Sequence, residues 1–136
     1  MAEERVAAGT ADAGVAHRGH LAIALDTDDL IEARRLVKEL APWFGVAKVG
    51  LQLFSAAGPD AVAALAESGV EVFLDLKLHD IPTTVAQAAR VVGSLGASYL
   101  TLHATGGVRM LRAGVDGLAE GAARAGLGRP TALAVT

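Results

Sequence analysis

From residue 21 onward, short apolar runs alternate with longer segments in which apolar residues recur every three or four positions. Short apolar runs predict buried strands, and the longer spacing predicts amphipathic helices. In the segment DDLIEARRLVKELAPW, for example, one face of a helix carries Leu30, Ala33, Leu36, Val37 and Leu40. The pattern predicts strands at 21–26, 44–50, 70–78, 97–103 and 131–136, and helices at 28–43, 58–69, 82–96 and 107–125.

Residues that start and stop helices support these boundaries. Asp28 and Asp29 stand where an N-cap and first-turn acids are preferred, and Pro42 ends that helix. Pro59 lies in the first turn of the second predicted helix. The fourth helix is the weakest, because interior glycines lower helix propensity and it contains Gly114, Gly117 and Gly121.

The regular alternation of strand and helix predicts an α/β fold with a parallel sheet. Two architectures compete, an open doubly wound sheet and a (β/α)8 TIM barrel. A glycine-rich phosphate loop, typical of dinucleotide-binding doubly wound sheets, is absent after the first strand. Several strands instead end in Asp26, Lys48, Asp75 with Lys77, and His103, which is typical of barrel active sites. We therefore predict a barrel.

The chain is short for a complete barrel, which needs eight strands and about 250 residues. It has 136 residues and supplies about five strands and four helices, so its first and fifth strands would be unpaired edges. We expect residues 20–136 to be the N-terminal part of a truncated barrel domain, preceded by a disordered leader at 1–19. The alternative is a complete chain that pairs its edges with a second copy.

Composition excludes several functional classes. Apolar residues make up 52% of the chain, aromatic residues 4%, and the formal net charge is -3. A packed core is therefore expected, and binding to nucleic acid or to an anionic membrane is not. The chain has no cysteine and no apolar run of the roughly 20 residues that span a membrane, so we expect a cytoplasmic protein. His17 and His20 are interpreted as solvated residues, and no metal site is predicted.

The segment FLDLKLHDIPTTV, residues 73–85, places charges in an otherwise apolar strand. Because side chains alternate along a strand, Asp75 and Lys77 point to one side, where Lys48 of the neighbouring strand can reach them. Asp80 follows on the loop. Such an array offsets the cost of burying each charge and keeps a lysine protonated, so that its ammonium could stabilise a carbanion and protonate it. The alternative is an exposed edge strand with solvated charges.

The same segment resembles the signature of the orotidine 5'-phosphate decarboxylase family, Asp-x-Lys-x-x-Asp followed by Ile-Pro and a threonine-rich helix start. Other strands resemble the family at IALD (23–26), VAKVGLQLFSAAGP (46–59), LHATGG (102–107) and LAVT (133–136). The resemblance covers about residues 20–136. It implies a homodimeric (β/α)8 barrel with shared active sites, which decarboxylates orotidine monophosphate to uridine monophosphate in pyrimidine biosynthesis without a cofactor.

The resemblance also implies residue roles. Lys77 resembles the proton donor to pyrimidine C6, Asp75 the carboxylate beside the departing CO₂, and Lys48 the lysine that bonds the ribose. Asp80 resembles an aspartate that reaches into the partner subunit's site, and these four residues are the expected catalytic group. Asp26 resembles a ribose-hydroxyl acceptor. The implied substrate-binding residues are Asp26, Lys48, Asp75, Lys77, Asp80, Ile81, Pro82, Thr83, Thr84 and Thr136.

In the family, the arginine and glutamine that hold the substrate phosphate belong to the second half of the barrel. Binding energy from a remote phosphate helps to drive catalysis, so we expect residues 1–136 alone to be inactive or nearly so.

Two other functions remain open. Magnesium-dependent sugar-phosphate decarboxylases or lyases of the same superfamily share the third-strand motif. Their pattern, however, has an acidic residue near the position where this chain has Lys48. A non-catalytic remnant that acts as an interaction module is the second alternative. His79 and His103 are interpreted as structural or interface histidines, and Arg109 and Arg112 as exposed helix residues.

Overall fold

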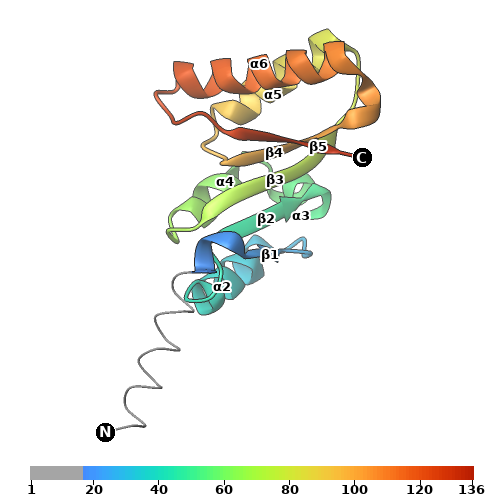
Figure 1. Cartoon of the computed structure of the whole chain (residues 1–136). Helices are drawn as coiled ribbons and strands as arrows, with labels where there is room; N and C mark the ends of the chain where they lie inside the picture. Colours follow the sequence, from blue (N-terminus) through green and yellow to red (C-terminus); the bar gives the residue numbers. More distant parts are fainter. Residues whose placement is uncertain (1–16) are drawn as a thin grey trace, which may run out of the picture.

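The computed structural model describes residues 17–136, which form a five-stranded parallel sheet with the strand order β1-β2-β3-β4-β5. Figure 1 shows the strands in this order, with β1 and β5 at the two edges and the C-terminus at the end of β5. The strands are β1 (Ala22–Ala24), β2 (Val46–Gly50), β3 (Glu71–Leu78), β4 (Tyr99–His103) and β5 (Thr131–Val135). The helices are α2 (Leu30–Leu40), α3 (Leu51–Ala57), α4 (Pro59–Ala66), α5 (Pro82–Gly93) and α6 (Val108–Arg124), with short 3-10 turns η1 (Arg18–His20) and η2 (Ala104–Gly106).

The five predicted strands and four predicted helices are confirmed, with ends that lie one to three residues inside most predicted boundaries. The apolar pattern does not predict α3, because seven residues are too few to establish a helical period. Gly58 separates α3 from α4 with φ 57° and ψ -142°, a conformation that favours glycine, and Pro59 then opens α4. The segment after β2 therefore contains two short helices.

The first turn of α2 shows which of the two predicted aspartates caps the helix. Asp29 is the N-cap, and its Oδ1 accepts hydrogen bonds from the backbone N–H groups of Ile31 (2.8 Å) and Glu32 (3.3 Å). Thr27 accepts from the Asp29 N–H and donates to the Glu32 carboxylate. The acidic residue of the first turn is Glu32, so Asp28 lies outside the cap.

The helices cover one face of the sheet, where the core lies (Figure 1). Alternate strand residues such as Val49, Leu74 and Leu100 point to this face and are fully buried. The other face carries half-buried Phe73 and Tyr99, whose rings meet edge to face at 5.9 Å. This second face is the one on which the charged residues of the third strand lie.

Helices α5 and α6 pack side by side, and the glycines of α6 allow their backbones to approach closely (Figure 1). A Cβ atom on Gly117 would overlap the carbonyl oxygen of Ala86, and one on Gly121 would overlap that of Arg90. Gly93 of α5 lies in the same way against the carbonyl of Leu118. Two of the glycines that weaken α6 as an isolated helix, Gly117 and Gly121, are therefore required for this contact.

The described chain begins with a turn that packs on the start of β2. The Gly45 N–H donates to the carbonyl of Arg18 (2.7 Å), and Arg18 Nε donates to the carbonyl of Phe44 (3.3 Å). The predicted disordered leader comprises residues 1–19, and its residues 1–16 lie outside the described residues. Among residues 17–136, no helix is long and apolar enough to cross a membrane.

Candidate active site

The third strand carries an irregularity at its carboxyl end, next to β4. Leu74 pairs with Leu100 and Leu78 with Leu102, so four positions of β3 pass two positions of β4. Lys77 adopts φ 48° within this bulge, in the left-handed region that non-glycine residues seldom occupy. Because two extra residues are inserted, the parity of the strand is kept, and Lys77 stays on the face of Asp75.

Lys48, Asp75 and Lys77 form one charged cluster on the open face of the sheet. Lys77 Nζ lies 2.8 Å from Asp75 Oδ1, and Lys48 Nζ lies 3.5 Å from Asp75 Oδ2. The Asp75 side chain is 13% exposed, whereas those of Lys48 and Lys77 are 29% and 40% exposed. The carboxylate is thus enclosed between two ammonium groups that remain open toward the space above the sheet.

A threonine of β4 completes the cluster, and the charge and apolar patterns of the sequence do not predict it. Thr101 is the buried polar residue of 17–136, with 4% exposure. Its hydroxyl donates to Asp75 Oδ1 (2.9 Å) and accepts from the backbone N–H of Lys77 (2.9 Å). The sequence feature that could have indicated it is a hydroxyl residue between the two buried leucines of YLTLH, on the strand next to the charged motif.

The cluster favours the ionised form of its central carboxylate. Burial by itself raises the pKa of Asp75, but hydrogen bonds from Lys77 and Thr101 and the charges of Lys77 and Lys48 outweigh it. The pKa of Asp75 therefore lies below its ordinary value. At neutral pH the site holds one carboxylate between two cations, with a net positive charge on its open side.

Asp80 lies on the loop between β3 and α5, apart from this cluster. Its Oδ1 accepts a hydrogen bond from the N–H of Ile81 (2.6 Å), the residue that caps α5, and within residues 17–136 it pairs with neither lysine. An open pocket of about 580 Å³ lies beside it, lined by His79, Asp80, Ile81, Pro82, Thr105 and Gly106. The structure therefore brings three of the four predicted catalytic residues together and leaves Asp80 facing an open pocket.

The other predicted substrate-binding residues lie at the same edge of the sheet. The Leu25 N–H donates to the carbonyl of Lys48 (3.0 Å), so Asp26 follows at the carboxyl end of β1. Thr83 and Thr84 are exposed in the first turn of α5, and Thr136 is exposed directly after β5. None of these four side chains bonds to the cluster among the described residues.

The two histidines of this edge are neighbours. The ring of His79 lies 5.1 Å from that of His103, centroid to centroid, with the planes tilted by 47°. Neither makes an ion pair within residues 17–136, and no group of three or more His, Cys, Asp or Glu in that range is arranged to hold a metal ion.

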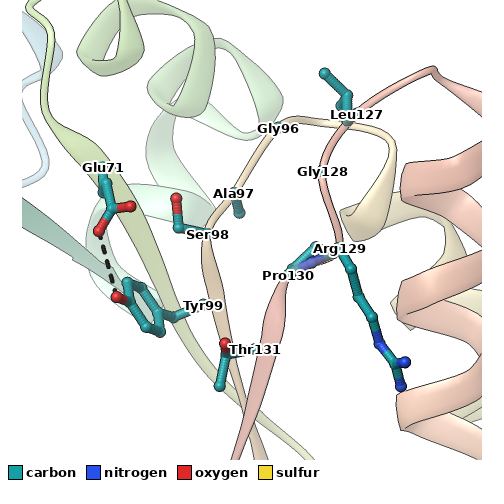
Figure 2. A pocket seen from close by; sticks show the side chains of 10 residues that line it. All are labelled: Glu71, Gly96, Ala97, Ser98, Tyr99, Leu127, Gly128, Arg129, Pro130 and Thr131. Atoms are coloured by element: carbon teal, nitrogen blue, oxygen red, sulfur yellow. Dashed lines mark hydrogen bonds between the residues drawn. The ribbon is translucent and has the colours of Figure 1, made fainter.

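A more enclosed pocket of about 340 Å³ lies at the opposite, amino-terminal ends of the strands (Figure 2). In it the Tyr99 hydroxyl donates to Glu71 (3.3 Å), and the charge of Glu71, with burial, raises the pKa of Tyr99. Shape alone favours this pocket, but chemistry does not, because barrel enzymes react at the carboxyl ends of their strands. We therefore assign the candidate active site to the charged cluster.

Successive strand–helix units, together with charged groups at the carboxyl ends of the strands, define the (β/α)8-barrel class of protein, of which this chain supplies five strands. The family model described as "Orotidine 5'-phosphate decarboxylase / HUMPS family" matches residues 19–136. The chain belongs to this family.

Individual relatives agree with that assignment. The chain is 48% identical over 114 residues to the orotidine 5'-phosphate decarboxylase of Moorella thermoacetica, covering 84% of this chain and 45% of the relative. It is 44% identical over 114 residues to that of Paramagnetospirillum magneticum, covering 84% and 48%. The crystal structure of the Lactobacillus acidophilus enzyme matches with a TM-score of 0.76 and 39% identity, over 85% of this chain and 52% of that one. The chain thus spans about half the length of the relatives it matches.

Proposed function

We propose that this chain supplies the charged part of an active site that decarboxylates orotidine 5'-phosphate to uridine 5'-phosphate. The observation that carries the proposal is the Lys48–Asp75–Lys77 cluster, with its carboxylate held between two ammonium groups. The remaining strands of the barrel would supply the groups that hold the substrate phosphate. The step belongs to pyrimidine biosynthesis, and we propose that the protein works in the cytoplasm.

The chemistry requires a stabilised carbanion. When the bond between C6 and the carboxylate breaks, its electron pair stays on C6 in the plane of the ring, where the π system cannot delocalise it. The Lys77 ammonium stabilises this charge and then gives a proton to C6, and its neutral amine regains a proton from water. CO₂ leaves from the side of Asp75.

Asp75 has two roles in this scheme. Its charge and its hydrogen bond hold the Lys77 ammonium in place, 2.8 Å from Oδ1. It also faces the substrate carboxylate, which favours release of that group as neutral CO₂. Lys48 orders the carboxylate from its Oδ2 side and is proposed to bond a ribose hydroxyl of the substrate. No cofactor takes part in this scheme.

Asp80 is proposed to act from one subunit of a homodimer in the site of the other. Its exposure and its position on the rim of an open pocket, with Ile81 and Pro82 beside it, support this role. The exposed Thr83 and Thr84 of the same helix start would contribute to the same contact.

A chimeric enzyme tests the proposal. Residues 19–136 would replace the matched segment of the Moorella thermoacetica relative, with the parent relative as the positive control. We expect the folded chimera to convert orotidine 5'-phosphate to uridine 5'-phosphate at an equal rate with and without EDTA. Activity toward a sugar phosphate that requires added Mg²⁺ would instead support the magnesium-dependent lyase. A folded chimera without either activity would support the interaction module.

A further inference from the structure

We propose that Thr101 is a positioning residue of this site, whose hydroxyl fixes both the Asp75 carboxylate and the bulged backbone of Lys77. The inference rests on the proposed function for its catalytic meaning, but the positioning itself is a property of the chain alone. Thr101 touches none of the reacting atoms in the scheme above, and it acts through its two neighbours.

The hydrogen-bonding capacity of one hydroxyl matches this arrangement. A threonine hydroxyl has one proton to donate and lone pairs to accept. Thr101 donates its proton to Asp75 Oδ1 and accepts the N–H of Lys77, each at 2.9 Å. A single buried atom thus joins a side chain and a backbone group that lie two positions apart on the neighbouring strand.

The bulge explains why a side chain is needed at this point. In a regular parallel ladder, every second N–H of β3 points to β4 and the others point to β2, as that of Glu71 does when it donates to Gly45. The register shift between Leu74 and Leu78 breaks this alternation. Lys77 lies inside the shift with φ 48°. A backbone N–H without an acceptor is costly where water is excluded, and the Thr101 hydroxyl supplies the acceptor.

Packing alone does not require a hydroxyl here. Valine has nearly the shape of threonine and is favoured in strands, so it would fill the space between Leu100 and Leu102 equally well. What valine cannot provide is the bond to Asp75 Oδ1, the oxygen that also accepts from Lys77 Nζ (2.8 Å). Two donors on Oδ1 hold the carboxylate so that Oδ2 faces Lys48.

The relevant experiment compares Thr101→Val with Thr101→Ser in the 136-residue chain, without substrate. Carboxyl carbon NMR would follow the titration of Asp75, and amide hydrogen exchange would follow Lys77. We expect the valine variant to raise the pKa of Asp75 toward its ordinary value and to speed exchange at Lys77. The serine variant keeps the hydroxyl and should leave both properties close to those of the unchanged chain.

A merely structural threonine would give another result. If the valine variant folds and leaves the pKa of Asp75 and the exchange of Lys77 unchanged, the positioning role is wrong. If the valine variant does not fold, the test rests on the same two measurements in the unchanged chain and in the serine variant. A protected Lys77 amide and a lowered pKa of Asp75 in both support the role, and rapid exchange at Lys77 in the unchanged chain overturns it.

The same substitutions in the chimeric enzyme separate this inference from the proposed function. We expect Thr101→Val to lower kcat more than it changes KM, and Thr101→Ser to restore kcat. If the chimera does not decarboxylate orotidine 5'-phosphate while the NMR shifts occur as expected, the positioning role stands and the proposed function fails. If the chimera is active and the valine variant keeps its full kcat, the positioning has no catalytic effect and the inference fails.

Discussion

The ammonium of Lys77 lies 2.8 Å from Oδ1 of Asp75, two positions earlier on the same strand. The left-handed backbone of Lys77 accompanies this contact, and Lys48 approaches the second carboxylate oxygen at 3.5 Å. The two lysines are therefore unequal partners, since Lys77 donates a short hydrogen bond and Lys48 acts at longer range.

This inequality can be measured as a shift in the pKa of Asp75. We expect both Lys77→Met and Lys48→Met to raise that pKa, and the Lys77 substitution to raise it more, because it removes a hydrogen bond together with a charge. Carboxyl carbon NMR of the 136-residue chain would give both values. An equal effect of the two substitutions would show that the contact at 2.8 Å has no special weight.

Acid should remove the stabilisation that Asp75 provides. Because the pKa of Asp75 is lower in the folded chain than in the unfolded one, its contribution is present above the ordinary pKa and is lost as the pH falls through the folded-state pKa. We expect Asp75→Asn to flatten the decrease in unfolding free energy below about pH 4. Urea denaturation over a pH series would measure it. Asp116→Asn, at an exposed position of α6, is the control and should leave the slope unchanged.

The close contact of α5 and α6 predicts an effect opposite to helix propensity. Gly121→Ala should improve the propensity of α6, yet the new Cβ would overlap the Arg90 carbonyl. We expect a net loss of about 1–3 kcal/mol of unfolding free energy, as overpacking usually costs. Ala123→Gly, at an exposed position of the same helix, measures the propensity contribution alone. A more stable Gly121→Ala variant would contradict the close contact.

The N-cap of α2 offers a matched pair of neighbouring aspartates. Asp29→Ala removes the acceptor of two backbone N–H groups and should cost about 1 kcal/mol of unfolding free energy. Asp28→Ala removes an exposed carboxylate outside the cap and should change stability much less. Thermal or urea denaturation of the two variants would decide, and equal losses would mean that the cap is assigned to the wrong residue.

Charges at the ends of apolar strands were sufficient to predict the cluster. Burying a single unpaired charge costs free energy, so the position of Lys48, Asp75 and Lys77 in buried strands indicated that these side chains meet. The structure confirms this contact. Alternation also placed them on the correct face of the sheet. The helix–strand order, and with it the parallel sheet, followed from the spacing of apolar residues.

The details that adjust the site could not be predicted in this way. The rule that side chains alternate between the two faces assumes a regular strand. The apolar pattern therefore does not predict the bulge or the left-handed backbone of Lys77. Thr101 is an ordinary strand residue until its partner across the bulge is known. The glycines of α6 lower helix propensity locally, and only the approach of α5 shows why they are required.

The most direct measurement of the proposed role of Lys77 is decarboxylation by the chimeric enzyme carrying Lys77→Met, against Lys38→Met as a control. Lys38 is the one lysine of the sequence outside the charged cluster, and it is exposed in the last turn of α2. General acid catalysis contributes about 100-fold to 10,000-fold, so we expect Lys77→Met to lower kcat/KM for orotidine 5'-phosphate by at least about 100-fold. The Lys38 variant should keep the full rate. A Lys77→Met enzyme that keeps the rate of the Lys38 variant would contradict the assignment of Lys77 as the proton donor.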